Sequence, residues 1–229
     1  MIKAVILAGG KGTRLRPITN NIPKAMVKIL DKPFLEYQIN LLRSYKITSF
    51  VICCCYLKEV IMDYFRDGSE FDVNIEYSIE KDFLGTGGAL KNAKKLITDK
   101  FLFLNGDSYL DIDYHGLVEF SLNNDYLGTI VSYDNQINIL KNNIQLNEKN
   151  MITGYSKVSE HGMDHIDAGV AIFNKKVLDL IPGDRQVSLE EEIYPSLIQK
   201  RQLAGYVVSK RFYDIGTLEG IKDIEEVLA

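Results

Sequence analysis

The chain has 229 residues, 46% of them hydrophobic and 25% charged, and a net charge of −4. This length and composition predict one folded unit over residues 1–229, large enough to bury a sizeable core. The negative charge argues against a nucleic-acid partner, although a small phosphate site needs only a few cations and backbone N–H groups. No apolar run reaches the ~18 residues of a membrane span, and no secretory signal begins the sequence. We therefore expect a cytoplasmic protein that does not bind membranes.

Short apolar runs alternate with amphipathic stretches over the first 125 residues. The apolar runs predict strands at Ile2–Leu7, Phe50–Cys55, Val73–Tyr77 and Phe101–Leu104. The amphipathic stretches predict helices at Pro33–Tyr45 (capped by Asp31), Lys58–Phe65, Gly88–Leu96 and Leu117–Asn123. This alternation predicts the α/β class, with a Rossmann-like, doubly wound, mainly parallel sheet and helices on both of its faces.

The pattern changes after residue 125, where strand-like segments follow one another with short turns. They lie at Gly128–Tyr133, Ile144–Asn147, Met151–Ser156 and Ile166–Phe173. They predict a small antiparallel insertion within about residues 126–175. Two helices, Leu189–Gln199 and Leu218–Leu228, are expected around a last strand at Ala204–Val208.

Three consecutive cysteines, Cys53, Cys54 and Cys55, end the second predicted strand. Neighbours in a strand point to opposite faces, so they would chelate a metal poorly. We expect them to be small buried side chains in a reducing compartment.

The segment Leu7–Pro17 reads Leu-Ala-Gly-Gly-Lys-Gly-Thr-Arg-Leu-Arg-Pro and directly follows a predicted strand. Ligands of parallel sheets bind beyond the carboxyl ends of the strands. Gly9, Gly10 and Gly12 allow backbone N–H groups to approach an anion, and Arg14 can donate two hydrogen bonds to a phosphate. The spacing matches neither a Walker A motif nor a dinucleotide fingerprint. Two interpretations remain from the glycines alone: a different kind of phosphate site, or a tight turn between a strand and a helix that binds no ligand.

This loop, with Thr13-Arg14-Leu15 and the later Pro23-Lys24, resembles the signature of the sugar-phosphate nucleotidyltransferase family. Further landmarks follow in the family's order and extend the resemblance to nearly the whole chain. They are Leu84-Gly85-Thr86-Gly87-Gly88-Ala89, Asn105-Gly106-Asp107, Lys157, Asp167-Ala168-Gly169 and Tyr213-Asp214-Ile215-Gly216-Thr217. Within the family, the compact length and the second glycine motif are most similar to the short bacterial heptose 1-phosphate guanylyltransferases.

The resemblance implies transfer of a nucleotidyl group from a nucleoside triphosphate to a sugar 1-phosphate, with release of pyrophosphate. Because two anions must meet, such a reaction needs Mg²⁺ and cationic side chains. Asp107 and Asp214 are the implied metal ligands, with Asp107 also counted as catalytic. Arg14 is expected at the departing pyrophosphate, and Lys24 at the α-phosphate or the incoming phosphate.

The remaining site residues divide between the two substrates. For the nucleotide they are Leu7, Gly9, Gly10, Gly12, Thr13, Glu80, Gly85 and Thr86. For the sugar phosphate they are Lys157, Asp167, Gly169 and Glu190. Asp167 stands where the family usually has Asn, which puts that sugar contact in doubt. Glu190, with Glu191 and Glu192, also fits a second interpretation as helix N-terminal acid after the cap Ser188.

Glu80, five residues before Gly85, is the expected base-reading side chain. A carboxylate only accepts hydrogen bonds, and guanine offers adjacent N1–H and N2–H₂ donors. Uracil offers one ring N–H between two acceptors, and cytosine an exocyclic amine. Glu80 therefore favours GTP, and a solvated loop charge is the alternative.

Other functions remain open from the sequence. The same chemistry could use CTP or UTP with choline phosphate or N-acetylmuramate 1-phosphate. A GT-A-type glycosyltransferase would use an Asp-x-Asp motif, and Asp111-Ile112-Asp113 supplies those letters. No sequence feature decides between a monomer and a homodimer.

Overall fold

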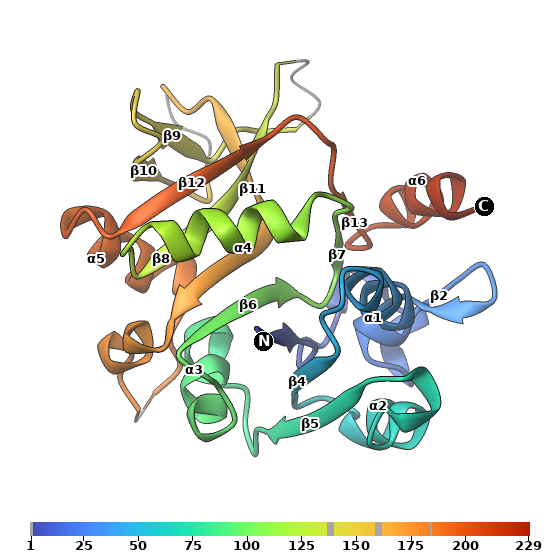
Figure 1. The fold of residues 1–229 in the computed structure, drawn as a ribbon. Helices are drawn as coiled ribbons and strands as arrows, with labels where there is room; N and C mark the ends of the chain where they lie inside the picture. Colours follow the sequence, from blue (N-terminus) through green and yellow to red (C-terminus); the bar gives the residue numbers. More distant parts are fainter. Residues whose placement is uncertain (1, 137–139, 159–161, 184) are drawn as a thin grey trace.

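The computed structural model describes residues 2–136, 140–158, 162–183 and 185–229 (Figure 1). Within these residues nine strands form one central sheet in the order β10-β9-β11-β6-β1-β4-β5, with β8 beside β11 and β12 beside β8. They are β1 (Lys3–Leu7), β4 (Ser49–Cys54), β5 (Asn74–Ile79), β6 (Lys100–Asn105), β8 (Gly128–Asp134), β9 (Ile144–Leu146), β10 (Ile152–Tyr155), β11 (His165–Asn174) and β12 (Leu203–Val208).

The sheet is parallel on both sides of one reversed strand. β1 pairs in parallel with β4 and β6, β4 with β5, and β12 with β8. β11 runs antiparallel to both β6 and β8, and the hairpin of β9 and β10 extends from its start. The predicted fold class is confirmed. The antiparallel residues are more than an added patch, because β11 lies inside the main sheet.

Helices cover both faces of the sheet, and the strands alternate accordingly. Side chains of α1 (Phe34–Ser44), α2 (Lys58–Phe65) and α4 (Tyr114–Asn123) share one buried cluster with Ile6 and Ile52. Side chains of α3 (Gly85–Asn92) and α5 (Tyr194–Gln199) share another with Val5 and Cys53. This alternation follows the two-residue period of a strand whose two faces are both covered.

A third, smaller cluster carries α6 (Leu218–Leu228), whose Ile224 packs with Leu15, Ile29 and Phe34. Figure 1 shows α6 and the C-terminus beside β13, near α1 and β2. The strands here have two residues each, too short for a periodic signal in the sequence. They form the pairs β2 (Lys28–Ile29) with β3 (Lys32–Pro33), and β7 (Ser108–Tyr109) with β13 (Tyr213–Asp214).

Four helix predictions need correction. α4 begins at Tyr114, three residues before the predicted Leu117, because Asp113 caps it there. Asp31 does not cap α1, because it lies in the turn between β2 and β3 and Pro33 holds the cap position. α3 begins at Gly85, three residues early, since the carbonyl of Val187 accepts the N–H of Gly87 at 2.9 Å and anchors the first turn. The helix predicted at Leu189–Gln199 is a π-helical turn, Leu189–Ile193, followed by α5.

The cysteines differ in burial. Cys53 and Cys54 are fully buried on opposite faces, as predicted. Cys55 is partly exposed, because β4 ends at Cys54, and its predicted burial is therefore wrong. In the described part of the chain, no helix combines the length and apolar character needed to cross a membrane.

Candidate functional site

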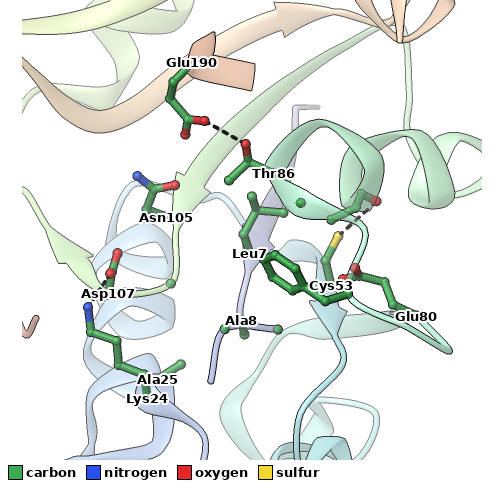
Figure 2. A pocket seen from close by; sticks show the side chains of 16 residues that line it. Leu7, Ala8, Lys24, Ala25, Cys53, Glu80, Thr86, Asn105, Asp107 and Glu190 are labelled. Atoms are coloured by element: carbon green, nitrogen blue, oxygen red, sulfur yellow. Dashed lines mark hydrogen bonds and ion pairs between the residues drawn. The ribbon is translucent and has the colours of Figure 1, made fainter. Parts of the chain in front are cut away.

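A cavity of about 260 Å³ opens where the carboxyl ends of β1, β4 and β6 meet (Figure 2). Such an edge is the usual ligand site of an open parallel sheet. The residues that line it are Leu7, Ala8, Gly9, Gly10, Lys24, Ala25, Cys53, Glu80, Phe83, Gly85, Thr86, Ala89, Asn105, Gly106, Asp107 and Glu190. Figure 2 shows Lys24 and Asp107 on one side, Glu80 and Cys53 on the other, and Leu7 and Ala8 between them.

Nine of the predicted site residues line this cavity. They are Leu7, Gly9, Gly10, Lys24, Glu80, Gly85, Thr86, Asp107 and Glu190. Seven others lie outside its lining: Gly12, Thr13, Arg14, Lys157, Asp167, Gly169 and Asp214. The structure thus brings the two glycine motifs and the Asn-Gly-Asp turn together at one cavity. The seven residues outside the lining were predicted to contact phosphates, the sugar phosphate or the metal.

The glycine loop has free space beside Gly10 and is tightly packed at Gly9 and Gly12. A Cβ built on Gly10 would have no heavy atom within 4 Å, whereas one on Gly9 would lie 3.1 Å from Glu80 Oε1. Gly12 has φ +59°, and its Cβ would lie 3.0 Å from Lys24. Conformation and crowding therefore both favour glycine at Gly12, while at Gly10 it leaves room for a ligand to approach the backbone.

Charged side chains from three distant segments meet around Gly216. Lys24 Nζ lies 2.5 Å from Asp107 Oδ2. A Cβ built on Gly216 would lie 2.5 Å from Asp214 Oδ1, 3.2 Å from Lys24 Nζ and 3.3 Å from Arg14 Nη2. Two cations and one carboxylate therefore converge on one small residue, and the second carboxylate, Asp107, contacts one of these cations. Gly216 stands within the predicted Tyr213–Thr217 motif, where no role was expected for it.

The backbone holds the two predicted metal ligands next to each other. Asp214 pairs with Ser108 in the β7–β13 ladder, and the N–H of Ile215 donates to the carbonyl of Asp107 at 3.0 Å. Mg²⁺ commonly takes one or two protein carboxylates and completes its shell with phosphate oxygens and water. Two carboxylate residues held side by side are a donor set of that kind. Among the described residues, no group of three or more His, Cys, Asp or Glu side chains is placed to hold a metal.

Glu80 is buried at the far side of the cavity. It is 4% exposed, and its Oε2 accepts the N–H of Leu84 at 3.0 Å. Burial raises the pKa of this carboxyl above its ordinary value, and the Leu84 N–H partly opposes the rise. A carboxylate withdrawn from water in a ligand cavity is expected to have a hydrogen-bonding partner there. The alternative of a solvated loop charge is wrong.

One glutamate of the three reaches the cavity. Glu190 accepts hydrogen bonds from Thr86 Oγ1 at 2.8 Å and from Ser188 Oγ at 2.7 Å. Glu191 pairs with Lys157 at 3.0 Å, and Glu192 with Arg185 at 2.6 Å. The geometry selects Glu190, and it also shows Thr86 anchored to Glu190 and to the Leu189 N–H.

Asp167 and Gly169 lie behind the Asn-Gly-Asp turn. A Cβ on Gly169, which has φ +73°, would lie 3.0 Å from Asn105 Nδ2. Asp167 accepts the Gly169 N–H at 2.9 Å and the Tyr155 hydroxyl at 3.2 Å. Burial raises the pKa of Asp167 to about 7, and the charge of Glu190 adds to the rise. Asp167 is therefore a titrating group close to neutral pH.

The Asp-x-Asp letters have a structural explanation. Asp111 pairs with Lys210 at 2.7 Å and accepts the Tyr45 hydroxyl. Asp113 caps α4 by accepting the N–H groups of His115 and Gly116. Neither lines the cavity, and in this structure the two carboxylates serve an ion pair and a helix cap.

Several residues that line the cavity were not predicted from the sequence. Asn105 was quoted in its motif without a role, and its position at the end of β6 was a usable signal. Phe83 lines the cavity although it is 46% exposed, and no pattern in the sequence singled it out. Cys53 reaches the cavity because β4 ends beside β1.

The fold and this site together define a class of α/β protein suited to bind phosphate groups. A glycine loop, cationic side chains and two neighbouring carboxylates lie at the carboxyl ends of its parallel strands. A family model described as nucleotidyl transferase matches residues 3–229. The chain belongs to this nucleotidyl transferase family, and the predicted family resemblance is confirmed.

Its relatives are nucleotidyltransferases acting on sugar 1-phosphates. The D-glycero-alpha-D-manno-heptose 1-phosphate guanylyltransferase of Campylobacter jejuni is 32% identical over 95% of this chain and 96% of that protein. The UTP–glucose-1-phosphate uridylyltransferase of Synechocystis sp. is 33% identical over 94% of this chain. The mannose-1-phosphate guanylyltransferase of Mycobacterium tuberculosis is 33% identical over 95%. The chain spans 60% and 62% of these last two relatives.

Solved structures of nucleotidyltransferases have the same fold as this chain. HddC from Yersinia pseudotuberculosis complexed with GMP-PN has a TM-score of 0.84 and 30% identity, covering all of both chains. A putative glucose-1-phosphate thymidylyltransferase from Bacillus anthracis has a TM-score of 0.88 at 20% identity, which supports the fold alone.

Proposed function

We propose that the chain transfers a guanylyl group from GTP to a sugar 1-phosphate, with a heptose 1-phosphate as first choice and Mg²⁺ as cofactor. One observation carries the proposal: a single cavity has the buried carboxylate Glu80 on one side and the Lys24–Asp107 ion pair on the other (Figure 2). The Campylobacter jejuni relative and the HddC complex with GMP-PN support the choice of guanine and heptose.

Glu80 supports guanine because its remaining hydrogen-bonding capacity is acceptor-only when ionised. One oxygen accepts from the N–H of Leu84, which holds the carboxylate, and a Cβ built on Gly9 would lie 3.1 Å from the other oxygen, so that oxygen lies close to the glycine loop. In our proposal it accepts from guanine N1–H and N2–H₂. Leu7, Gly85 and Phe83 would then enclose the base and ribose.

The reaction forms one bond and breaks one. A phosphate oxygen of the sugar 1-phosphate attacks the α-phosphorus of GTP, the bond to the β-phosphate bridging oxygen breaks, and pyrophosphate leaves. The nucleophile is already an anion, so no general base is needed. When bound at Asp107 and Asp214, Mg²⁺ supplies charge neutralisation and alignment of the phosphates. Arg14 would hold the departing pyrophosphate, and Lys24 the α-phosphate or incoming phosphate.

The sugar phosphate would enter from the β11 and α5 side. Glu190 lines the cavity there and would accept sugar hydroxyl hydrogens. Lys157 is half exposed and paired with Glu191, so it would exchange that partner for the sugar phosphate. Asp167 and Gly169 lie one layer further back and would shape this end.

A GDP-sugar made in this way would serve surface polysaccharide synthesis. Its substrates are cytoplasmic metabolites, so we place the enzyme in the cytoplasm. A homodimer is compatible with this function, and light scattering of the purified protein would decide between it and a monomer.

Uridylyl transfer is the second candidate, because the Synechocystis relative acts with UTP on glucose 1-phosphate. A matrix of GTP, UTP, CTP and ATP against sugar 1-phosphates, choline phosphate and N-acetylmuramate 1-phosphate tests both candidates. We expect pyrophosphate release only with Mg²⁺, and fastest with GTP and a heptose 1-phosphate. Absence of pyrophosphate release from every pair would overturn the proposal.

A further inference from the structure

Gln38 lies on α1, 1% exposed, and binds the Asn-Gly-Asp turn from behind. Its Nε2 donates to the carbonyl of Asn105 at 2.9 Å and to the carbonyl of Ser108 at 2.6 Å. These two carbonyls flank Gly106 and Asp107. One side-chain amide therefore closes the turn that carries the predicted metal ligand.

The chemistry of the amide fixes its orientation. The –NH₂ group has two donors, one for each carbonyl, whereas the opposite orientation would place three oxygens together. Gln38 Oε1 is buried and has no hydrogen-bond partner among the described residues. An unpartnered buried acceptor is destabilising. An apolar side chain of similar size would avoid that cost, so the two donors are the feature that Gln38 contributes.

Two backbone hydrogen bonds also hold this turn in place. The N–H of Gly106 donates to the carbonyl of Leu7 at 3.0 Å, and the carbonyl of Asp107 accepts the N–H of Ile215 at 3.0 Å. These bonds tie the turn to β1 and to the segment of Asp214. Gln38 ties it to α1, so the backbone of Asp107 is held from a third direction.

We propose that Gln38 is a positioning residue that holds the Asp107 carboxylate in place for the divalent cation. This inference rests on the proposed function, in which Asp107 and Asp214 bind Mg²⁺. It predicts that losing the two amide donors weakens metal binding more than it weakens the fold. Partners that orient metal ligands commonly change metal affinity about 10- to 100-fold when they are removed.

The test compares Gln38→Met with Tyr114→Phe. Tyr114 is also buried, and its hydroxyl donates to the carbonyl of Leu110 at 2.8 Å, just beyond the same turn. Both variants lose buried donors to backbone carbonyls. Only Gln38→Met loses donors that flank Asp107. Binding of Mn²⁺ is measured by electron paramagnetic resonance with a non-hydrolysable GTP analogue present, and metal-free thermal unfolding is measured in parallel.

We expect Mn²⁺ to bind at least about tenfold more weakly to Gln38→Met than to the unmodified chain. Tyr114→Phe should bind Mn²⁺ as tightly as the unmodified chain does. Gln38→Leu is the second variant should Gln38→Met fail to fold. Folded variants with Mn²⁺ affinity within about twofold of the unmodified chain would overturn the inference while leaving the proposed function intact. An unmodified chain that binds the GTP analogue but no Mn²⁺ would overturn both.

Discussion

Lys24 Nζ and Asp107 Oδ2 form an ion pair of 2.5 Å that joins the segment after the glycine loop to the end of β6. Both side chains are largely shielded, with 13% and 35% of their surfaces exposed. Asp107 is also a predicted metal ligand, so a bound cation and Lys24 would share one carboxylate. Lys24 would then be available to a phosphate when the metal is bound.

Asp107→Asn should lower turnover at least about 100-fold, because a neutral amide binds Mg²⁺ poorly and no longer pairs with Lys24. Pyrophosphate release measures turnover, and circular dichroism checks the fold. Asp111→Asn is the matched control, since Asp111 pairs with Lys210 away from the cavity. Equal turnover in the two variants would refute the assignment of Asp107.

Gly10→Ala should raise the KM for GTP about tenfold without loss of stability, an effect comparable to one hydrogen bond to a charged group. A Cβ at Gly10 meets no protein atom within 4 Å, yet the residue lines the cavity. The same substitution at Gly183, also without neighbours within 4 Å, lies outside the cavity lining. Steady-state kinetics of both variants decide: an unchanged KM in Gly10→Ala would mean that no phosphate approaches this backbone.

Glu80→Gln should reduce kcat/KM for GTP by about 10- to 100-fold, because an amide offers one acceptor where the carboxylate offers two. Inosine triphosphate lacks the guanine N2 amine and therefore serves as the matched substrate. The preference for GTP over inosine triphosphate should shrink in the variant. If that ratio is the same in both proteins, Glu80 does not read the base.

Lys157→Ala should raise the KM for the sugar phosphate about tenfold and leave the KM for GTP unchanged, because only the first substrate is expected to contact it. Stability should change little, since the Lys157–Glu191 pair is exposed. Glu191→Ala breaks the same ion pair but keeps the cation. Comparing the two variants separates loss of the pair from loss of a phosphate contact.

Asp167 should make stability depend on pH. Its pKa is raised from 3.8 to about 7, so between these values the folded chain holds a proton that the unfolded chain releases. Stability should therefore fall as pH rises from about 4 to 7, by up to about 1.4 kcal/mol per pH unit, and level off above 7. Asp167→Asn removes this dependence. Urea unfolding from pH 5 to 8 measures it, and parallel curves for the two proteins would contradict it.

Local patterns in the sequence were sufficient for most of the sheet. Val5 and Ile6 are consecutive apolar residues, which indicates a strand buried on both faces. The structure confirms this, because the two side chains lie in different buried clusters. The two-residue strands β7 and β13 could not be predicted in this way. Their pairing brings Ser108 against Asp214, residues far apart in the chain, and local propensity contains no information about that contact.

The candidate site likewise has features that local sequence predicts and features that depend on tertiary contacts. The sequence by itself determined that Gly9, Gly10 and Gly12 follow a strand and that cations stand nearby, because turn conformation and residue chemistry are local properties. Only the tertiary structure decided that Glu190 rather than Glu191 or Glu192 lines the cavity. It likewise showed that Asp113 is a helix cap and that Lys24 and Asp107 pair. These choices depend on how helices and strands pack, which fixes the direction of each side chain only once the whole sheet has formed.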